Sequence, residues 1–283
     1  MKKVLLISLP ILVIILAATG YFYGAPALQT NGYKTVARTN QLALASSTNK
    51  AIGAASQNAF LAQGISIPET KNALKISKDA IADLETKIHS NEKSLTNLSE
   101  MPLVASVNPN YKATLELKSL EIQYIQASKD YLAEFKAVTA YNEKSASILE
   151  LAEDFDKIGE KFETAESEAD VMAIIDQYIS KLNQVNKIAT AMKPAESVKE
   201  MHQLNLQSLQ QLTQLMKDLK AALQALDLEK LMTLSESADK INTDFEKQSK
   251  KLAIKLVEES KLAKLGNKLN DLGKKIDTKT AEL

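Results

Sequence analysis

Residues 209–226 read LQQLTQLMKDLKAALQAL, and their apolar side chains recur at alternating steps of three and four residues. An average step of about 3.5 residues is typical of helices that pack against one another along a narrow seam. A half-buried strand would instead alternate apolar and polar side chains at every second position. The stretch therefore predicts a long amphipathic helix whose seam consists of Leu209, Leu212, Met216, Leu219, Leu223 and Leu226.

The same spacing recurs along most of the chain after residue 66, and strand-type alternation does not replace it. The pattern predicts an all-α fold made of long antiparallel helices. The other predicted seams are Leu74, Ser77, Ile81, Leu84, Ile88, Asn91, Leu95 and Leu98; Leu117, Leu120, Tyr124, Ala127, Tyr131, Phe135 and Val138; Tyr141, Ser145, Ile148, Ala152, Phe155, Ile158 and Phe162; Ile175, Tyr178, Leu182, Val185, Ala189 and Met192; and Leu231, Leu234, Ala238, Ile241, Phe245 and Leu252.

Capping residues and prolines divide this pattern into separate helices. Residues 66–69 (SIPE) and 167–170 (SEAD) are capping-box patterns, in which the first side chain binds backbone N–H groups of the first turn. Pro102, Pro109 and Pro194 interrupt the helices, because proline lacks the N–H that a helix interior needs. These prolines count against one unbroken rod, which is the rival architecture.

Two softer breaks are expected, at residues 139–142 and at Asp227. If the helices end at these two positions, residues 67–166 and residues 167–283 each contain three helices, the first two separated by a proline turn and the last two by one of these breaks. We therefore expect two antiparallel three-helix bundles in series, the second ending in a lysine-rich tail that frays. Whether the two units are a true duplication stays open, because helical sequence of low complexity imitates repeats.

An uncharged apolar run, Val4–Tyr23, follows Lys2 and Lys3 at the start of the chain. About twenty helical residues cover the roughly 30 Å of a bilayer's hydrocarbon core. The two lysines favour a cytoplasmic amino terminus and an extracytoplasmic body. We expect residues 1–24 to be a single transmembrane helix; the alternative is a signal peptide, whose cleavage would release a secreted body.

Residues 25–66 contain few charged side chains and are rich in alanine, serine and asparagine. They are either a flexible stalk or a weak helix from about Gln41 to Ala62. In chain order, the sequence therefore predicts an anchor (1–24), this stalk or weak helix (25–66), bundle unit 1 (67–166) and bundle unit 2 (167–283).

Composition argues against several classes of function. The formal net charge is zero, so the chain as a whole does not attract polyanions, and Arg38 is the only arginine that could bind a phosphate or a base through two parallel hydrogen bonds. Neither feature favours binding to nucleic acid. The absence of cysteine excludes disulfides, thiol nucleophiles and thiolate metal sites. No catalytic triad, phosphate loop or zinc-protease motif occurs, so we expect neither an enzyme nor a bound cofactor.

Four groups of residues are candidates for binding. His89 and His202 are the only histidines, and we interpret both as solvated rather than as metal ligands, because a metal site needs at least three converging ligands. The acids between Glu150 and Asp170 suit a cation or a basic partner, although Ile158 breaks the apparent calcium loop; a solvated face is the simpler interpretation.

The lysines between residues 247 and 279 suit anionic envelope polymer, lipid headgroups or a clasp with the 150–170 acids, although an ordinary exposed helix face is the simpler interpretation. The remaining group is aromatic, and its members line either helix cores or a pocket for an aromatic or amphiphilic ligand. These residues are Tyr111, Tyr124, Tyr131, Tyr141 and Tyr178.

Heptad helices without a catalytic grouping favour a membrane-anchored, extracytoplasmic helical bundle that acts as a non-catalytic interaction or scaffold module at the cell envelope. Its expected partners are the membrane and either another protein or its own copy. The alternative function is a ligand-binding, sensor-type bundle that signals through a partner.

Overall fold

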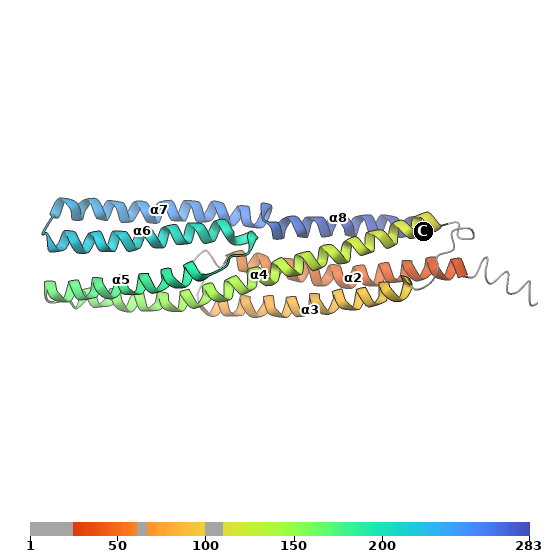
Figure 1. The fold of residues 1–283 in the computed structure, drawn as a ribbon, viewed down its shortest axis with the longest axis horizontal. Helices are drawn as coiled ribbons and strands as arrows, with labels where there is room; N and C mark the ends of the chain where they lie inside the picture. The colour runs from red at the N-terminus through yellow and green to blue at the C-terminus, as the bar shows by residue number, and fades with distance from the viewer. Residues whose placement is uncertain (1–24, 61–66, 100–109) are drawn as a thin grey trace, which may run out of the picture. The chain divides into compact units, whose positions relative to one another are not determined.

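The computed structural model describes residues 25–60, 67–99 and 110–283, and throughout these ranges the secondary structure is helical, without a β-strand (Figure 1). The predicted all-α fold is therefore confirmed. The helices are α2 (Ala25–Phe60), α3 (Ile67–Ser99), α4 (Tyr111–Glu163), α5 (Glu168–Ala191), the 3-10 turn η3 (Glu196–Val198), α6 (Lys199–Gln224), α7 (Leu228–Glu259) and α8 (Lys261–Glu282).

A search of the described helices finds none with an apolar stretch long enough to cross a membrane. The predicted anchor, residues 1–24, lies outside the described ranges. For residues 25–66, the structure has the helix rather than the stalk, from Ala25 to Phe60. Tyr33, Ala37 and Leu44 lie fully buried at multiples of the three- and four-residue step, so α2 is held by a seam of its own.

The predicted seams of α3 and α4 are largely buried. On α3 even the polar members, Ser77 and Asn91, are buried together with Leu84. The soft break expected at residues 139–142 is absent, and α4 continues through it. That stretch contains neither proline nor glycine, and Thr139 and Tyr141 are buried there, so nothing interrupts the helix.

Predicted caps occur at two helix starts. The Ser167 hydroxyl accepts a hydrogen bond from the Asp170 N–H (3.2 Å), and the Asp170 carboxylate accepts one from the Ser167 N–H (3.0 Å). This reciprocal pair is the capping box expected before α5. Asp227 caps α7 by accepting a hydrogen bond from the Lys230 N–H (3.0 Å), which confirms the break predicted there.

The turn between α6 and α7 places Leu226 in the left-handed region, with φ = 51°. The Asp227 N–H donates to the Ala222 carbonyl (3.0 Å), and the Leu226 N–H donates to the Leu223 carbonyl (3.1 Å). These two bonds form a Schellman motif, in which the left-handed position is usually glycine. The leucine is 77% exposed, so packing does not compensate for its conformation.

Contacts divide the chain into two compact units that interleave along the sequence. Among the described residues, unit 1 combines residues 25–50, 82–99, 110–132 and 265–283, whereas unit 2 combines residues 51–60, 67–81 and 133–264. The tail expected to fray is helical in the structure, and Gly266 within it is buried.

Unit 1 is built from parts of α2, α3, α4 and α8 around a common core. Three polar contacts join these helices: Lys129 pairs with Glu92, Lys279 pairs with Glu116 (2.6 Å), and the hydroxyl of the buried Ser47 donates to Asp83 (2.7 Å). Its largest fully buried side chains are Tyr33, Leu44, Leu84, Leu117, Tyr131, Leu269 and Ile276.

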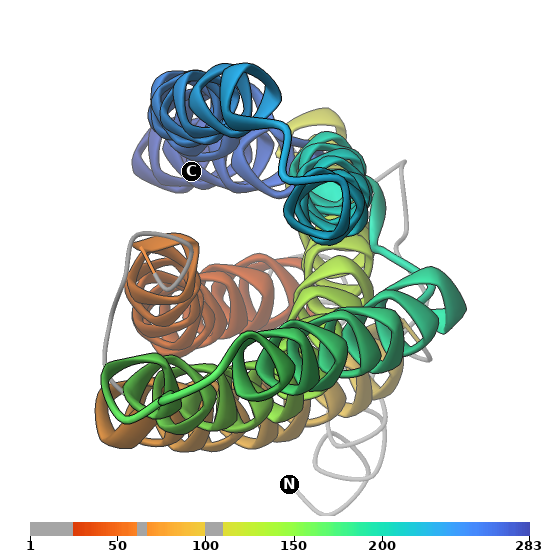
Figure 2. The same ribbon diagram turned by 90° about the vertical axis from the view of Figure 1, so that its left-hand side faces the viewer.

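In unit 2, α5 packs on α6 and α6 packs on α7, as Figures 1 and 2 both show for the hairpin. The turn η3, which follows Pro194, contributes to a separate apolar cluster. Partly buried Ile148 and Leu256 pack against that cluster. Its buried members are Val138, Tyr141, Met192, Ala195 and Val198.

Candidate functional site

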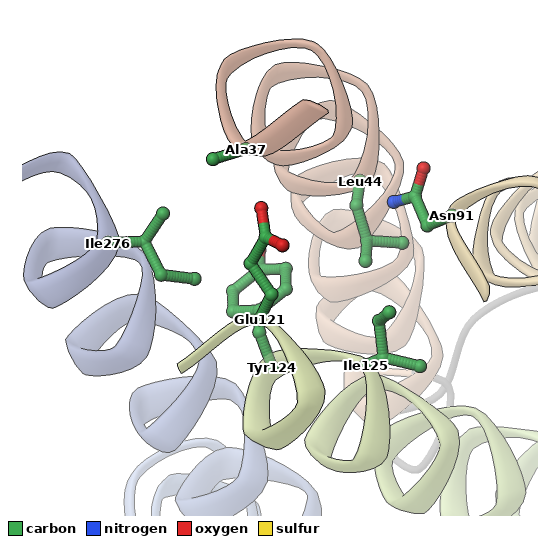
Figure 3. A pocket seen from close by; sticks show the side chains of 7 residues that line it. All are labelled: Ala37, Leu44, Asn91, Glu121, Tyr124, Ile125 and Ile276. Atoms are coloured by element: carbon green, nitrogen blue, oxygen red, sulfur yellow. The ribbon is translucent and has the colours of Figure 1, made fainter. Parts of the chain in front are cut away.

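A cavity inside unit 1 lies among α2, α3, α4 and α8. Its empty space, including the part open to solvent, is about 290 Å³. Figure 3 shows the lining side chains, which are Ala37, Leu44, Asn91, Glu121, Tyr124, Ile125 and Ile276.

Of the seven residues that line the cavity, Glu121 is the acidic one. Its carboxyl group points away from α4 toward Ala37, with Ile276 on one side and Leu44 on the other (Figure 3). The residue is 6% exposed, and neither carboxyl oxygen has a hydrogen-bond partner among the described residues. Buried polar groups in proteins are nearly always paired, so an unpaired carboxyl group marks a site that a ligand or water would complete.

Burial raises the pKa of Glu121 from 4.5 to about 8, because the charged form loses its hydration. The side chain is therefore mostly neutral at pH 7 and offers both a donor and an acceptor. Burial also raises the pKa of the neighbouring Tyr124; the Thr48 hydroxyl opposes this shift, and the Asp277 charge adds to it. Two titratable groups thus face one apolar space.

The sequence analysis missed Glu121, although a signal for it exists. Leu117, Glu121, Tyr124 and Ser128 follow steps of four, three and four residues, and all four are buried. The predicted seam used Leu120 instead, which is only half-buried in the structure. Both Leu120 and Glu121 fit steps of three and four residues between Leu117 and Tyr124, so the spacing is a weak signal that does not decide between them.

A second glutamate of α4, Glu134, lies in unit 2 and has partners. Its carboxylate accepts a hydrogen bond from the Ser197 N–H (2.9 Å) and pairs with the Lys261 ammonium (3.0 Å). Burial alone would raise its pKa, but these donors outweigh burial and the pKa is lowered. The Ser197 hydroxyl in turn accepts from the Leu262 N–H (3.0 Å), so this network joins α4, η3 and the start of α8.

The two histidines differ. His89 is exposed, as expected, but the prediction of a solvated His202 is wrong: it is 6% exposed. Its Nδ1 lies 3.2 Å from the Tyr141 hydroxyl, and the two rings meet edge to face. Burial lowers the pKa of His202, so the neutral ring is favoured. Within the described ranges, no three acidic or histidine side chains converge as a metal site would require.

The tyrosines proposed for a pocket are mostly core residues. Tyr124 lines the cavity, whereas Tyr131 and Tyr141 are buried in helix interfaces. Tyr178 packs against Phe155, with ring centroids 4.8 Å apart. Among the residues that line the cavity, Tyr124 is therefore the aromatic one, and the other tyrosines do not contribute to it.

The acidic and lysine-rich segments have separate partners. Asp154 pairs with Lys181 (2.7 Å), whereas Lys255 pairs with Glu200 (2.6 Å). Lys279 pairs with Glu116, which lies well before the acidic segment in the sequence. Both segments are thus engaged in ordinary surface ion pairs, which contribute little stability each.

Comparison of the chain with protein-family models, with curated proteins and with solved structures gave no match in any of the three cases.

Proposed function

We propose that the chain is a membrane-anchored, extracytoplasmic interaction module that associates with a second copy of itself through the hairpin of α6 and α7. The anchor and its orientation are supported by the uncharged run after Lys2 and Lys3. The observation that carries the association is the incompletely covered apolar seam of the hairpin.

The seam residues of the hairpin are half-buried rather than buried. On α7, the buried residues are Ser249 and Ala253 alone. Met232 and Ile254, also on α7, are 72% and 62% exposed. Two such hairpins can cover each other by forming a four-helix arrangement. The half-buried seam residues are Leu209, Leu212, Met216, Leu219, Leu223, Leu231, Leu234, Ile241, Phe245 and Leu252.

The charges of α7 favour a second copy over an unrelated partner. Its first part is mainly acidic, although Lys230 and Lys240 interrupt it, and the following part is basic before Glu258 and Glu259. An antiparallel copy of α7, with Phe245 near the two-fold axis, places Asp239 opposite the partner's Lys251. The acids are Glu229, Glu236, Asp239, Asp244 and Glu246; the bases are Lys247, Lys250, Lys251 and Lys255.

Charge reversal tests this proposal through complementation. We expect the acidic variant Lys251→Glu and the basic variant Asp239→Lys each to be monomeric alone in mild detergent. An equimolar mixture should dimerise again, because the reversed charges face each other. The readout is sedimentation of the full chain at low salt. A matched control, Lys274→Glu/Lys275→Glu on α8, should dimerise as the wild type does.

The lack of cysteine allows a positional test as well. A Phe245→Cys chain should form a disulfide-linked dimer under mild oxidation, since the same residue of both copies meets at the axis. A Met232→Cys chain, whose cysteine is at a more exposed position but far from the axis, should not. Monomeric wild type, or cross-linking at both positions alike, would refute the antiparallel pairing.

A second candidate function, the ligand-binding bundle, is favoured by one specific observation: the Glu121 carboxyl group in the cavity of unit 1 has no hydrogen-bond partner within the described ranges. A thermal-shift screen of the full chain tests it. Reproducible stabilisation that disappears in Ala37→Val, a variant with a smaller cavity, would support ligand binding; no stabilisation across a broad set would contradict it.

A further inference from the structure

We propose that the exposed face of α7 is a second self-association surface, through which two copies of the chain pair antiparallel about Thr243. This surface goes beyond the proposed dimer, whose contact is centred on Phe245. Thr243 and Phe245 are two residues apart and therefore lie about 200° apart around the helix, on nearly opposite faces. Together, the two contacts join dimers into a larger assembly.

The large exposed apolar side chains of α7 fall on one stripe of the helix. Their exposed fractions range from 46% to 75%. Two charged residues and a threonine continue the stripe between them, at steps of three, four or seven residues, which return to the same side of an α-helix. In chain order the members of this outer stripe, all of them exposed, are Leu228, Met232, Glu236, Thr243, Lys250, Ile254 and Val257.

The order of residues in the outer stripe is symmetric about Thr243, with the charge reversed. Glu236 and Lys250 are each seven residues from Thr243. Met232 and Ile254 are each eleven residues from it. An antiparallel copy centred on Thr243 therefore places Glu236 opposite the partner's Lys250, and Met232 opposite the partner's Ile254.

The charges select the antiparallel direction. A parallel copy would place Glu236 opposite the same glutamate, and Lys250 opposite the same lysine, and such like-charge contacts are unfavourable. Within its own helix, Lys250 reaches only Glu246, at 3.6 Å. Both side chains of this pair are exposed, so the pair is weak and leaves the lysine able to contact a partner.

The apolar ends distinguish the outer stripe from an ordinary solvated helix face. Pairing covers Leu228 and Met232 of each copy with the part of the partner that contains Ile254 and Val257, so apolar surface at both ends leaves water. The centre of the contact is polar, which makes it weaker than an apolar seam. We therefore expect it to form at protein concentrations well above those that complete the first dimer.

Engineered cysteines in the full chain test the pairing, since the chain has none of its own. Under mild oxidation in mild detergent at high protein concentration, we expect Thr243→Cys to give a disulfide-linked dimer, because the same residue of both copies meets at the axis. A mixture of Met232→Cys and Ile254→Cys chains should also link. Neither chain should link alone, because two copies of either position lie about 33 Å apart along the pair.

A charge exchange tests the contact between Glu236 and the partner's Lys250. In the Thr243→Cys chain, Glu236→Lys and Lys250→Glu should each lower the linked fraction several-fold, and both together should restore it, because the exchanged charges again oppose each other. The control Lys274→Glu, at an exposed position of α8, should leave the linked fraction unchanged. The changed residues are all exposed, so no variant loses a buried contact.

The outer contact and the first dimer can fail separately. If Phe245→Cys links and Thr243→Cys does not, the first dimer stands and the present inference is overturned. If Thr243→Cys links and Phe245→Cys does not, the copies associate through the outer stripe alone. Linking of Met232→Cys by itself as readily as in the mixture, or a double charge exchange that restores nothing, would also overturn the antiparallel pairing about Thr243.

Discussion

Glu121 and Glu134 show that partners, rather than burial, decide the ionisation of a glutamate. Both lie on α4 and both are 6% exposed. Glu134 accepts from the Ser197 N–H and Lys261, and its pKa is lowered; Glu121 has no hydrogen-bond partner among the described residues, and its pKa rises to about 8. Only Glu121 therefore lowers the stability of the native state at neutral pH, because the native state must hold a proton that the unfolded chain releases.

Replacing Glu121 by glutamine should therefore stabilise the protein as pH rises. Between pH 4.5 and about 8 the unfolded chain loses this proton and the native state keeps it, so wild-type stability falls with pH. We expect Glu121→Gln to gain roughly 3–5 kcal/mol over wild type at pH 8 and little at pH 4.5, since each pKa unit corresponds to about 1.4 kcal/mol.

Urea unfolding followed by circular dichroism measures this difference, with Glu160→Gln as the exposed control on the same helix. The control should track the wild type at both pH values. A gain in Glu121→Gln that is the same at pH 4.5 and pH 8 would show that ionisation is not its source.

Sequence alone places most of the seam residues but not the site. The heptad spacing located Leu84, Asn91 and Tyr131 correctly, because burial of one helix face follows directly from periodicity. Glu121 and His202 were missed for a common reason. Each is a polar side chain at a buried position, and whether its surroundings offer partners depends on helices distant in the sequence.

At the scale of single elements, the helix ends follow local rules while one turn breaks them. Ser167 and Asp227 cap α5 and α7 as their sequences predict. Leu226, between α6 and α7, occupies a left-handed position that favours glycine. An exposed leucine held in this conformation is a small local strain.

Glycine at position 226 should relieve that strain. We expect Leu226→Gly to raise the free energy of unfolding of the hairpin by roughly 0.5–1 kcal/mol, because no buried contact is lost. Thermal unfolding measures the change. Ala225→Gly, one residue earlier and in right-handed helical conformation, should instead lower stability, and an increase there would point to a cause other than the backbone angle.

The turn η3 provides a second prediction for a single element. Ser197→Ala removes the acceptor of the Leu262 N–H and leaves the bond from the Ser197 backbone to Glu134 intact. We expect a loss of about 1–2 kcal/mol, as for other part-buried hydrogen bonds. Chemical denaturation measures it against Ser235→Ala, an exposed serine on α7 that should change stability little. Equal effects of both variants would show that the hydrogen bond between the Ser197 hydroxyl and the Leu262 N–H does not stabilise the fold.

For the molecule as a whole, the sequence predicts the class of fold better than its assembly. A heptad seam indicates that a helix is amphipathic, but not which helix covers it. The partner of a seam can lie far away in the sequence: the contacts group residues 82–99 and 110–132 with residues 265–283. The continuity of α4 was missed because its stripe changes position near residue 140 without any residue that ends a helix.

The proposed topology makes a prediction for intact cells. A protease added from outside should degrade the body between residues 67 and 283, because the charges of Lys2 and Lys3 favour a cytoplasmic amino terminus. An immunoblot against the carboxyl-terminal residues, with a cytoplasmic protein as the protected control, measures this. Protection of the body until the cells are lysed would refute the orientation.

The interleaving of the units bears on the order in which the chain can fold during synthesis. Leu269, Leu272 and Ile276, near the carboxyl end, are buried in the unit that α2 begins. Unit 2 ends at Lys264, so the ribosome finishes all of its segments first. The apolar stripe of α2 within this unit therefore stays exposed to chaperones during synthesis until α8 emerges and covers it.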